Sequence, residues 1–280
     1  MAEGVRKNKY YIAKIVGYVL IVLIVAFAVF PIVWTGISSF KVTRDIITPV
    51  PRLIFTPTLR NYIELFQLPD IQRGLVNSLI IVPAAVLLGF VAGIPASYIF
   101  ARFTFRGRED LRFWVITLRM LPPVAIVIPF TSIWIRLGLY DAKAALIITY
   151  LLITLPIIIW LSIESFRRIP IECEEAAMVE GCSYFQVFWK IAFPLALPTL
   201  IGGLLFTFIL LWNEYFIAFA LSSRHSMTMP VAAAAFAVSG LEVPWGRIAA
   251  SIITLSIPPL ILTSIFRGSL QSYFVPSDLD

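Results

Sequence analysis

The sequence predicts an all-α fold: a polytopic membrane protein with six transmembrane helices and one short helix in a cytoplasmic connection. Hydrophobic residues make up 60% of the chain and charged residues only 14%, whereas about a quarter of the residues of a soluble protein are charged. The apolar residues form near-continuous runs of about 20 residues, the length that a helix needs to cross about 30 Å of hydrocarbon. Such runs favour helices over the shorter strands of a membrane barrel.

Six runs are long enough to be spans, and the connections between them hold no seventh. The first run is not predicted to be a secretory signal peptide, because it is longer than the usual apolar region and the "GISSFK" that follows offers no A-x-A cleavage site. We therefore predict a single membrane domain over residues 15–266. Its predicted spans are residues 15–38, 75–100, 113–136, 144–166, 195–221 and 248–266.

Basic residues predict the orientation of the spans, because they are retained on the cytoplasmic side. Four precede the first span, and four lie in the short connection between the second and third spans. We therefore expect cytoplasmic ends at 1–14 and 267–280 in the inner (cytoplasmic) membrane, an external loop at 39–74 made irregular by its prolines, and a cytoplasmic connection at 167–194. The orienting residues are Arg6, Lys7, Lys9, Lys14, Arg102, Arg106, Arg108 and Arg112.

Several function classes find no support in the sequence. The net charge of +6 is largely that of the orienting residues and does not indicate a nucleic-acid partner. No Gly-Lys dipeptide occurs, hence no Walker A loop, and neither H-E-x-x-H nor G-x-S-x-G is present. The single histidine, His225, falls in a predicted external loop, and Cys173 and Cys182 lack metal-site spacing. We expect no catalytic residue, metal or cofactor in this chain; any ATP would be hydrolysed by another subunit.

The connection at 167–194 carries helix signals. Pro170 suits a first helical position, and the carboxylates of Glu172, Glu174 and Glu175 complement the positive end of a helix dipole. Gly181 can take the left-handed conformation that closes a last turn, so we predict a helix of about ten residues. Its alanines give it a slim face for close approach to another surface; the alternative is a solvated helix without a partner.

A second helix is predicted immediately afterwards. Ser183 and Gln186 form the pattern of a capping box. The apolar residues that follow suit a helix lying at the lipid surface, before Pro194 bends the chain into the fifth span. These residues are Tyr184, Phe185, Phe188, Trp189 and Ile191.

The spacing of these residues resembles the EAA loop, E-A-A-x₃-G-x₉-I-x-L-P, of permease subunits in binding-protein-dependent ABC importers. Phe193 stands where the family usually has leucine, a hydrophobic exchange. In that family the loop forms a coupling helix that docks into a cleft of the ATP-hydrolysing subunit. The resemblance therefore implies a coupling role for Glu175, Ala176, Ala177, Gly181, Ile191 and Pro194.

The resemblance extends over nearly the whole chain, through "TLRNY", "NSLIIV", "ASYIFARFTFRGR", "RMLPPVAIVIPF", "LWNEYFIAFAL" and "QSYFV". These segments are similar to the carbohydrate branch, in particular the smaller six-span permease subunit of maltose-type systems. The resemblance implies a type I importer permease fold, a sugar or polyol cargo, a second and homologous permease subunit, two ATP-binding subunits that hold ATP and Mg²⁺, and an external solute-binding protein. The ending "VPSDLD" departs from the usual Gly-rich tail, so no role is inferred for it.

Polar residues within the predicted spans form a second set of candidates, because each is costly in hydrocarbon. Arg119 and Glu164 lie near cytoplasmic ends, where snorkelling or ion pairing explains them. Trp212, Asn213 and Glu214 cluster in the outer half of the fifth span, and an indole beside an amide and a carboxylate can hold a sugar. An interfacial aromatic anchor with helix-packing polar groups explains them equally well.

Two other function classes stay open. An ion-coupled secondary transporter of a small polar solute would work alone, and its uptake would survive ATP depletion but collapse with the ion gradient. A membrane-embedded hydrolase would act as the isolated chain. The sequence names neither the sugar nor whether the second permease is a homologue or an identical copy.

Overall fold

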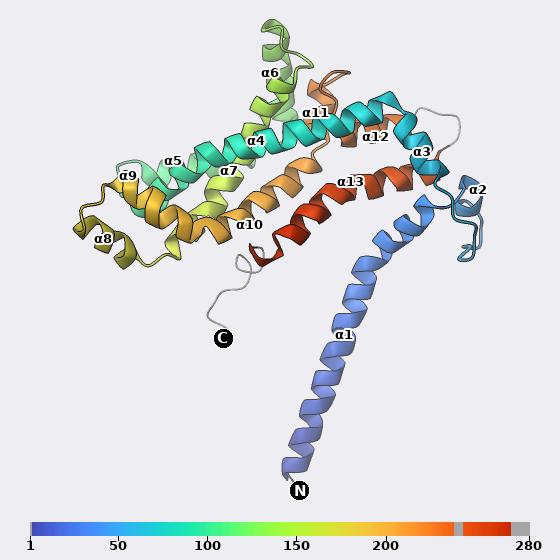
Figure 1. Cartoon of the computed structure of the whole chain (residues 1–280), viewed down its shortest axis with the longest axis horizontal. Helices are drawn as coiled ribbons and strands as arrows, with labels where there is room; N and C mark the ends of the chain where they lie inside the picture. The colour runs from blue at the N-terminus through green and yellow to red at the C-terminus, as the bar shows by residue number, and fades with distance from the viewer. Residues whose placement is uncertain (1, 238–242, 270–280) are drawn as a thin grey trace. The chain divides into compact units, whose positions relative to one another are not determined.

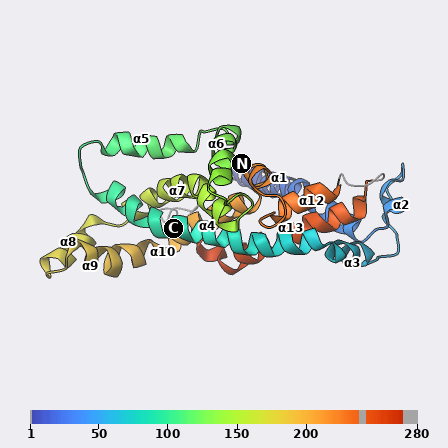
Figure 2. The ribbon, with the colours of Figure 1, turned by 90° about the horizontal axis from the view of Figure 1, so that it is seen from above.

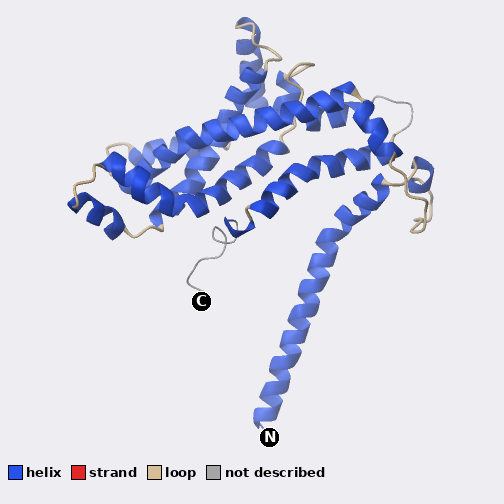
Figure 3. Cartoon of the chain, viewed as in Figure 1, coloured by secondary structure: helices blue, strands red, loops and turns tan. Residues whose placement is uncertain are grey.

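The computed structural model describes residues 2–237 and 243–269, with side chains from Lys14 onward. All regular structure in this part of the chain is helical (Figure 3). The helices, labelled as in Figure 1, are α1 (Ala2–Ser39), α2 (Thr43–Ile46), α3 (Arg60–Gln67), α4 (Pro69–Arg102), α5 (Arg108–Leu118), α6 (Pro123–Arg136), α7 (Lys143–Arg167), α8 (Ile171–Val179), α9 (Tyr184–Val187), the π-helix η1 (Phe188–Ala192), α10 (Phe193–Trp212), α11 (Phe216–Leu221), α12 (Met229–Ala237) and α13 (Trp245–Ile265).

The predicted fold class is confirmed. Within the described residues, five helices are long and apolar enough to cross a membrane, and a sixth crossing follows if the bent pair α5 and α6 counts as one span. The chain forms two compact units, one of residues 1–67 and 237–255 and the other of residues 68–236 and 256–280. The predictions about the orientation of the termini and about a single domain stay predictions.

In the first unit, the predicted span 15–38 lies within α1. None of the side chains in its most apolar stretch is buried against the unit. A helix that is apolar on all sides and unburied requires hydrocarbon around it. Lipid or another subunit must therefore cover α1.

The predicted external loop 39–74 is more ordered than its prolines suggest, since it contains α2, α3 and the start of α4. Lys41 is 2% exposed, and its ammonium donates to the carbonyl of Arg52 at 2.6 Å. The same ammonium lies 4.9 Å from the ring centroids of both Trp34 and Phe55. Cation–π contacts and a buried hydrogen bond thus hold the start of the loop.

In the second unit, α4 packs lengthwise against α7 and also contacts α10. Two glycines on α4 allow this close approach. A Cβ atom at Gly89 would lie 2.6 Å from the Thr154 hydroxyl, and one at Gly93 would lie 3.0 Å from the Ile158 side chain. Small residues four apart let helix backbones approach in membranes, where packing rather than the hydrophobic effect holds helices together.

The predicted third span, 113–136, is wrong as a single continuous helix. The chain breaks after α5, and α6 runs at 87° to it. Figure 2 shows α6 turned away from the direction of α5. Pro122 lies in extended backbone with ψ 139°, because a residue that precedes a proline, here Pro123, is disfavoured in the helical region. Apolar runs flank the break on both sides and conceal it in the sequence.

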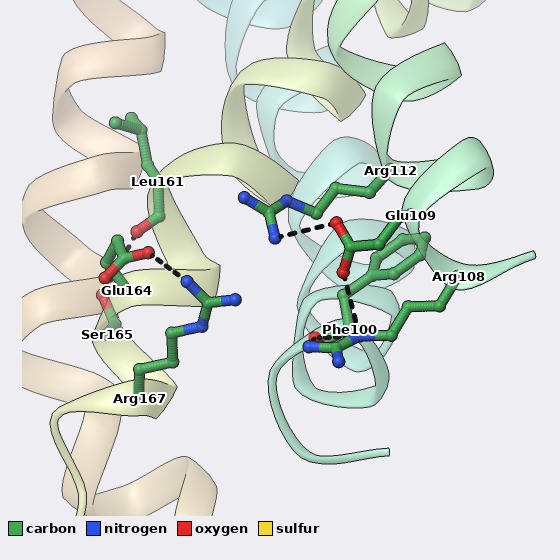
Figure 4. Close-up of polar contacts among 8 residues, drawn as sticks. All are labelled: Phe100, Arg108, Glu109, Arg112, Leu161, Glu164, Ser165 and Arg167. Carbon is green, nitrogen blue, oxygen red and sulfur yellow. Dashed lines mark hydrogen bonds and ion pairs between the residues drawn. The ribbon is translucent and has the colours of Figure 1, made fainter. Parts of the chain in front are cut away.

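The basic connection after α4 is closed by local contacts (Figure 4). Arg108 donates to the carbonyl of Phe100 at 2.6 and 3.1 Å. On α7, Arg167 pairs with Glu164 at 2.9 Å. Ion pairing therefore explains Glu164, as predicted.

Two predictions about the fifth span are corrected. One candidate span runs from Tyr184 to Trp212, so the predicted surface helix is the beginning of this span and Pro194 does not bend it away. A π-turn precedes the proline, in which the N–H of Phe193 donates to the carbonyl of Phe188. At the other end, the predicted span 195–221 is interrupted after Trp212, and α11 is a separate helix.

Asp141, between α6 and α7, holds the loop between α11 and α12. Its Oδ1 accepts hydrogen bonds from the backbone N–H groups of Ser223 and Ser226, and its Oδ2 from those of Arg224 and His225, at 2.9–3.0 Å. Burial alone would raise the pKa of Asp141, but these four N–H groups stabilise its anion, and the net effect is a pKa well below the usual value. The loop that carries His225 is therefore fixed through its backbone.

Replacing Asp141 with asparagine should lower the free energy of unfolding by roughly 2 kcal/mol at neutral pH, because an amide accepts with only one of its two polar atoms. The folded-state pKa of Asp141 is lowered. Its stabilisation is therefore complete above the unfolded-state pKa of about 3.9 and is lost as the pH falls below it. Thermal unfolding in detergent, followed from neutral pH into acid, checks this.

The native chain and the Asp141→Asn variant should converge in acid. Asp70, whose side chain is 61% exposed on α4, offers the control, because its replacement by asparagine should change little at any pH. A difference between native chain and Asp141→Asn that stays constant down to acid pH would contradict the assignment.

Candidate functional site

The predicted helix in the connection 167–194 is α8, of nine residues. Pro170 precedes it as the N-cap, with φ −56° and ψ 132°, so the helix begins one residue later than predicted. The ring fixes φ at a helical value but leaves ψ free. Glu172 and Glu174 lie in the first turn, where their charge complements the helix dipole.

Gly181 closes α8, as the sequence predicts. Its φ is +95°, the N–H of Cys182 donates to the carbonyl of Ala177, and the N–H of Gly181 donates to that of Met178, both at 3.0 Å. This pair of bonds is the Schellman motif. No atom lies within 4 Å of the position that a Cβ would take at Gly181, so the requirement for glycine is purely conformational.

The predicted capping box is confirmed. The N–H of Ser183 donates to Oε1 of Gln186 at 2.9 Å, and the N–H of Gln186 donates to the Ser183 hydroxyl at 3.4 Å. The helix that continues into α10 thus begins two residues after the turn that ends α8. The Schellman turn and the capping box together therefore fix how α8 leads into the fifth span.

Glu174 anchors α8 to the transmembrane part, a role that the sequence did not reveal. Its side chain is 5% exposed. Its carboxylate accepts a hydrogen bond from the Tyr98 hydroxyl at 2.7 Å and from Nε of Arg102 at 2.8 Å. Arg102 also donates to the carbonyl of Ile169 at 2.7 Å. Because both charges are buried and matched, α8 is held on the end of α4.

Aromatic rings surround this pair. The Tyr98 ring lies 5.0 Å from that of Phe188, 5.3 Å from that of Phe166 and 6.0 Å from that of Phe103, measured between centroids. These rings come from α4, α7, η1 and the turn after α4. The only advance signal was that Tyr98 and Arg102 are four residues apart and so share one face of α4.

The residues of the EAA pattern do not form one outward surface. Glu175 and Ala176 are exposed, as is Val179 at 90%. Ala177 is 8% exposed and faces the chain itself, beside Glu174. The outward surface of α8 therefore includes Glu175, Ala176 and Val179, and a bulky residue in place of Ala177 would first disturb this protomer.

The remaining two residues of the pattern lie in the following helix. Ile191 is half-buried in η1, and Pro194 is exposed in the first turn of α10. Neither is part of α8 itself. Their place in the structure is at the start of the fifth span, where they continue the helix that the capping box begins.

The three predicted cargo residues lie at the end of α10 but in different surroundings. Trp212 is 1% exposed and stacks on Phe208 at 5.5 Å. Asn213, the C-cap, is exposed, and its amide nitrogen donates to the carbonyl of Ile209 at 2.8 Å. The amide oxygen of Asn213 is thus the polar atom of this group that stays available to a ligand.

Glu214 holds the beginning of α11. Its carboxylate accepts from the backbone N–H groups of Ile217 and Ala218 at 2.7 and 3.1 Å, and from the hydroxyl of buried Tyr150 at 2.9 Å. A carboxylate at the first N–H groups of a helix satisfies donors that lack intrahelical partners. Within the described residues, no group of three His, Cys, Asp or Glu side chains could hold a metal ion.

Replacing Glu174 with alanine should lower the free energy of unfolding by roughly 3 kcal/mol, because it leaves the Arg102 guanidinium buried without its carboxylate. The neighbouring Glu175 is the matched control, since it is exposed and its replacement by alanine should cost less than about 0.5 kcal/mol. Unfolding in lipid bicelles measures both. Equal losses in the two variants would contradict the anchoring role of Glu174.

Comparison with known proteins places this geometry in a family. The family described as "Binding-protein-dependent transport system inner membrane component" matches residues 85–277. The trehalose transport system permease protein SugB of Mycobacterium tuberculosis is 33% identical over 252 residues, 89% of this chain and 91% of its own. The trehalose/maltose transport system permease protein MalG of Thermococcus litoralis is 30% identical over 275 residues, 97% of this chain and 96% of its own.

A solved structure agrees on the fold. A chain of a bacterial ABC transporter involved in import of the acidic polysaccharide alginate superposes with a TM-score of 0.76 at 23% identity, covering 94% of this chain and 97% of that chain. The chain therefore belongs to the binding-protein-dependent transport system inner membrane components, the multi-pass permease subunits of ABC importers, in which a separate subunit hydrolyses ATP.

Proposed function

We propose that this chain forms half of the translocation path of an ATP-driven importer for a di- or oligosaccharide or a polyol. Support comes from the relatives named for trehalose and maltose transport, which match it over nearly its full length. The similarity to an alginate importer supports the same architecture. The other half of the path is a second permease subunit, homologous or identical.

The remaining partners follow from the family. An external solute-binding protein delivers the sugar, and two ATP-binding subunits hold ATP and Mg²⁺ on the cytoplasmic side. The cytoplasmic termini and the cytoplasmic position of α8 belong to this proposal. They rest on the basic residues that precede the first span and on those that follow α4. Glu174 attaches α8 to this same end of α4.

The attachment of α8 is the observation that carries the coupling part of the proposal. A helix that must transmit force has to be rigid within itself and fixed to what it moves. The Schellman turn at Gly181 and the capping box at Ser183 supply the rigidity, and Glu174 supplies the attachment. The exposed Glu175, Ala176 and Val179 then meet the ATP-binding subunit.

The interruption after α10 supports a path at Asn213. Irregular backbone at membrane depth occurs where it is covered by protein or lines a water-filled cavity. Glu214 and the Asn213 amide nitrogen satisfy part of the freed backbone, and the Asn213 oxygen points to no partner within the described residues. We assign cargo contact to Asn213 and the holding of α11 to Glu214. The buried Trp212, which precedes them in the chain, supports both residues.

Uptake by proteoliposomes tests the proposal against the rival, a secondary transporter. The chain is reconstituted with its co-purifying subunits and the binding protein, and radiolabelled trehalose, maltose and a uronate oligosaccharide serve as probes. We expect uptake of at least one probe that requires internal ATP and persists when ion gradients are dissipated. Uptake that survives ATP depletion and collapses with an ion gradient would favour the rival.

A bulky residue on α8 tests the coupling in the same vesicles. Tryptophan in place of Ala176 should abolish uptake, because it blocks close approach of the ATP-binding subunit. The same exchange at Ala28, exposed on α1, is the control and should leave uptake unchanged. Normal uptake by the Ala176→Trp variant would remove that residue from the docking surface.

A further inference from the structure

The break between α5 and α6 exposes polar groups at membrane depth. Residues Arg119–Pro122 connect the two helices, and all four are exposed in this protomer. The guanidinium of Arg119 lies over the Trp160 ring of α7, 5.7 Å from its centroid. Trp160 is itself 48% exposed, so the stacked pair lies on the surface of the second unit.

Three other arginines at the same end of the bundle have carboxylate partners, unlike Arg119. Arg102 pairs with Glu174, Arg112 with Glu109 and Arg167 with Glu164. The Arg119 guanidinium makes no hydrogen bond or ion pair with any described residue. Ion pairing thus explains Glu164 but not Arg119, for which the alternative expectation, snorkelling, stays a prediction.

The backbone of the break also lacks some of its hydrogen-bond partners. The N–H groups of Arg119, Met120 and Leu121 donate to carbonyls three residues back. The carbonyl oxygens of the same three residues accept no hydrogen bond from the part of the chain that the structure describes. Three carbonyl acceptors and one cation with five donors therefore have no hydrogen-bond partner among the described residues.

The position of Trp160 along α7 indicates how deep the break lies within the membrane. Seven residues of α7 separate Trp160 from the end of the candidate span at Arg167, a rise of about 10 Å. Unpaired carbonyls facing hydrocarbon each cost several kcal/mol, and lipid-exposed irregular backbone does not occur within the membrane core. This face must therefore meet water, a polar ligand or another subunit rather than lipid tails.

We propose that Arg119, stacked on Trp160, lines the aqueous translocation path and binds the sugar cargo through two adjacent oxygen atoms. The guanidinium offers a planar fork of donors that fits a carboxylate or a pair of neighbouring hydroxyls. Stacking on the indole holds the fork in place without using any of those donors. This inference rests on the proposed function. It adds a cargo contact that lies nearer the Arg167 end of α7 than Asn213 does.

Arg119 would bind a carboxylate and a pair of hydroxyls with different strength. No carboxylate of the described residues neutralises Arg119, so a uronate group of the cargo would gain a full ion pair. Hydroxyl pairs of a neutral sugar would gain only charge-assisted hydrogen bonds. A site of this kind therefore favours acidic over neutral sugars that the binding protein delivers equally well.

The first experiment tests whether the site meets water. Cysteine is placed at Arg119, or at Trp114 as control, in an importer in which Cys173 and Cys182 are serine. Trp114 is 67% exposed on the apolar, regular part of α5. A membrane-impermeant cationic thiol reagent applied to inside-out vesicles should label position 119 and not 114, and saturating transported sugar should slow labelling at 119 several-fold. Equal labelling at both positions, or none at 119, would overturn the inference.

The second experiment tests cargo contact by kinetics. Arg119→Gln should raise the KM for vesicle uptake of a transported probe roughly 10- to 100-fold, as expected for loss of a charge-assisted fork. Stimulation of ATP hydrolysis by the loaded binding protein should be unchanged. Arg119→Lys should recover part of the loss, and Arg112→Gln, which removes an ion-paired arginine of α5, should leave KM unchanged.

The outcomes separate this inference from the function on which it rests. Failure of the unsubstituted importer to move trehalose, maltose or a uronate oligosaccharide would contradict the proposed function. Transport of any probe with an unchanged KM in Arg119→Gln would contradict the cargo contact alone. A fall in ATP hydrolysis that parallels the fall in uptake would assign Arg119 to subunit assembly instead.

Discussion

The buried carboxylate of Glu174 is the interaction on which the rest of the structure depends. It lies between the Tyr98 hydroxyl and the Arg102 guanidinium, at 2.7 and 2.8 Å. Separating such a pair in a dry site costs several kcal/mol, because each charge loses its partner before water replaces it. We therefore infer that α8 does not move independently of α4. Since α4 in turn packs on α7 through Gly89 and Gly93, displacement of α8 passes directly to the membrane helices.

The two helix breaks of this unit differ in how their polar groups are satisfied. After α10, Asn213 and Glu214 satisfy the freed backbone with their own side chains, and Tyr150 supports Glu214. After α5, the carbonyls and the guanidinium find no partner in the described chain. The first break is satisfied in part by side chains of the protomer itself, whereas the second requires water, cargo or another subunit. A permease built as two halves around a water-filled path satisfies this requirement.

Features governed by local rules could be predicted from the sequence. Composition gave the helical membrane fold, Gly181 its left-handed turn, and Ser183 with Gln186 the capping box. Features that depend on distant residues could not. Glu174 contacts Tyr98 and Arg102 only after folding. The sequence does not indicate that Glu174 is buried while the neighbouring Glu175 is exposed. The inward position of Ala177 has the same origin. The breaks were missed because long apolar runs flank them on both sides and outweigh the few polar residues at each break, although Pro122 and Pro123 together were a usable signal.

The distance between α8 and α4 during the ATP cycle tests the central claim most directly. One spin label is placed on native Cys173, which is exposed on α8, and a second on cysteine at Leu88 of α4, with Cys182 replaced by serine. Pulsed electron–electron double resonance then measures the distance between the labels in the nucleotide-free importer and in one trapped in its ATP-bound state. The labelled complexes used must still hydrolyse ATP. If Glu174 fixes α8 to α4, the distance distribution stays the same in both states. A shift of several ångströms would show that α8 moves independently of α4 and would contradict the account.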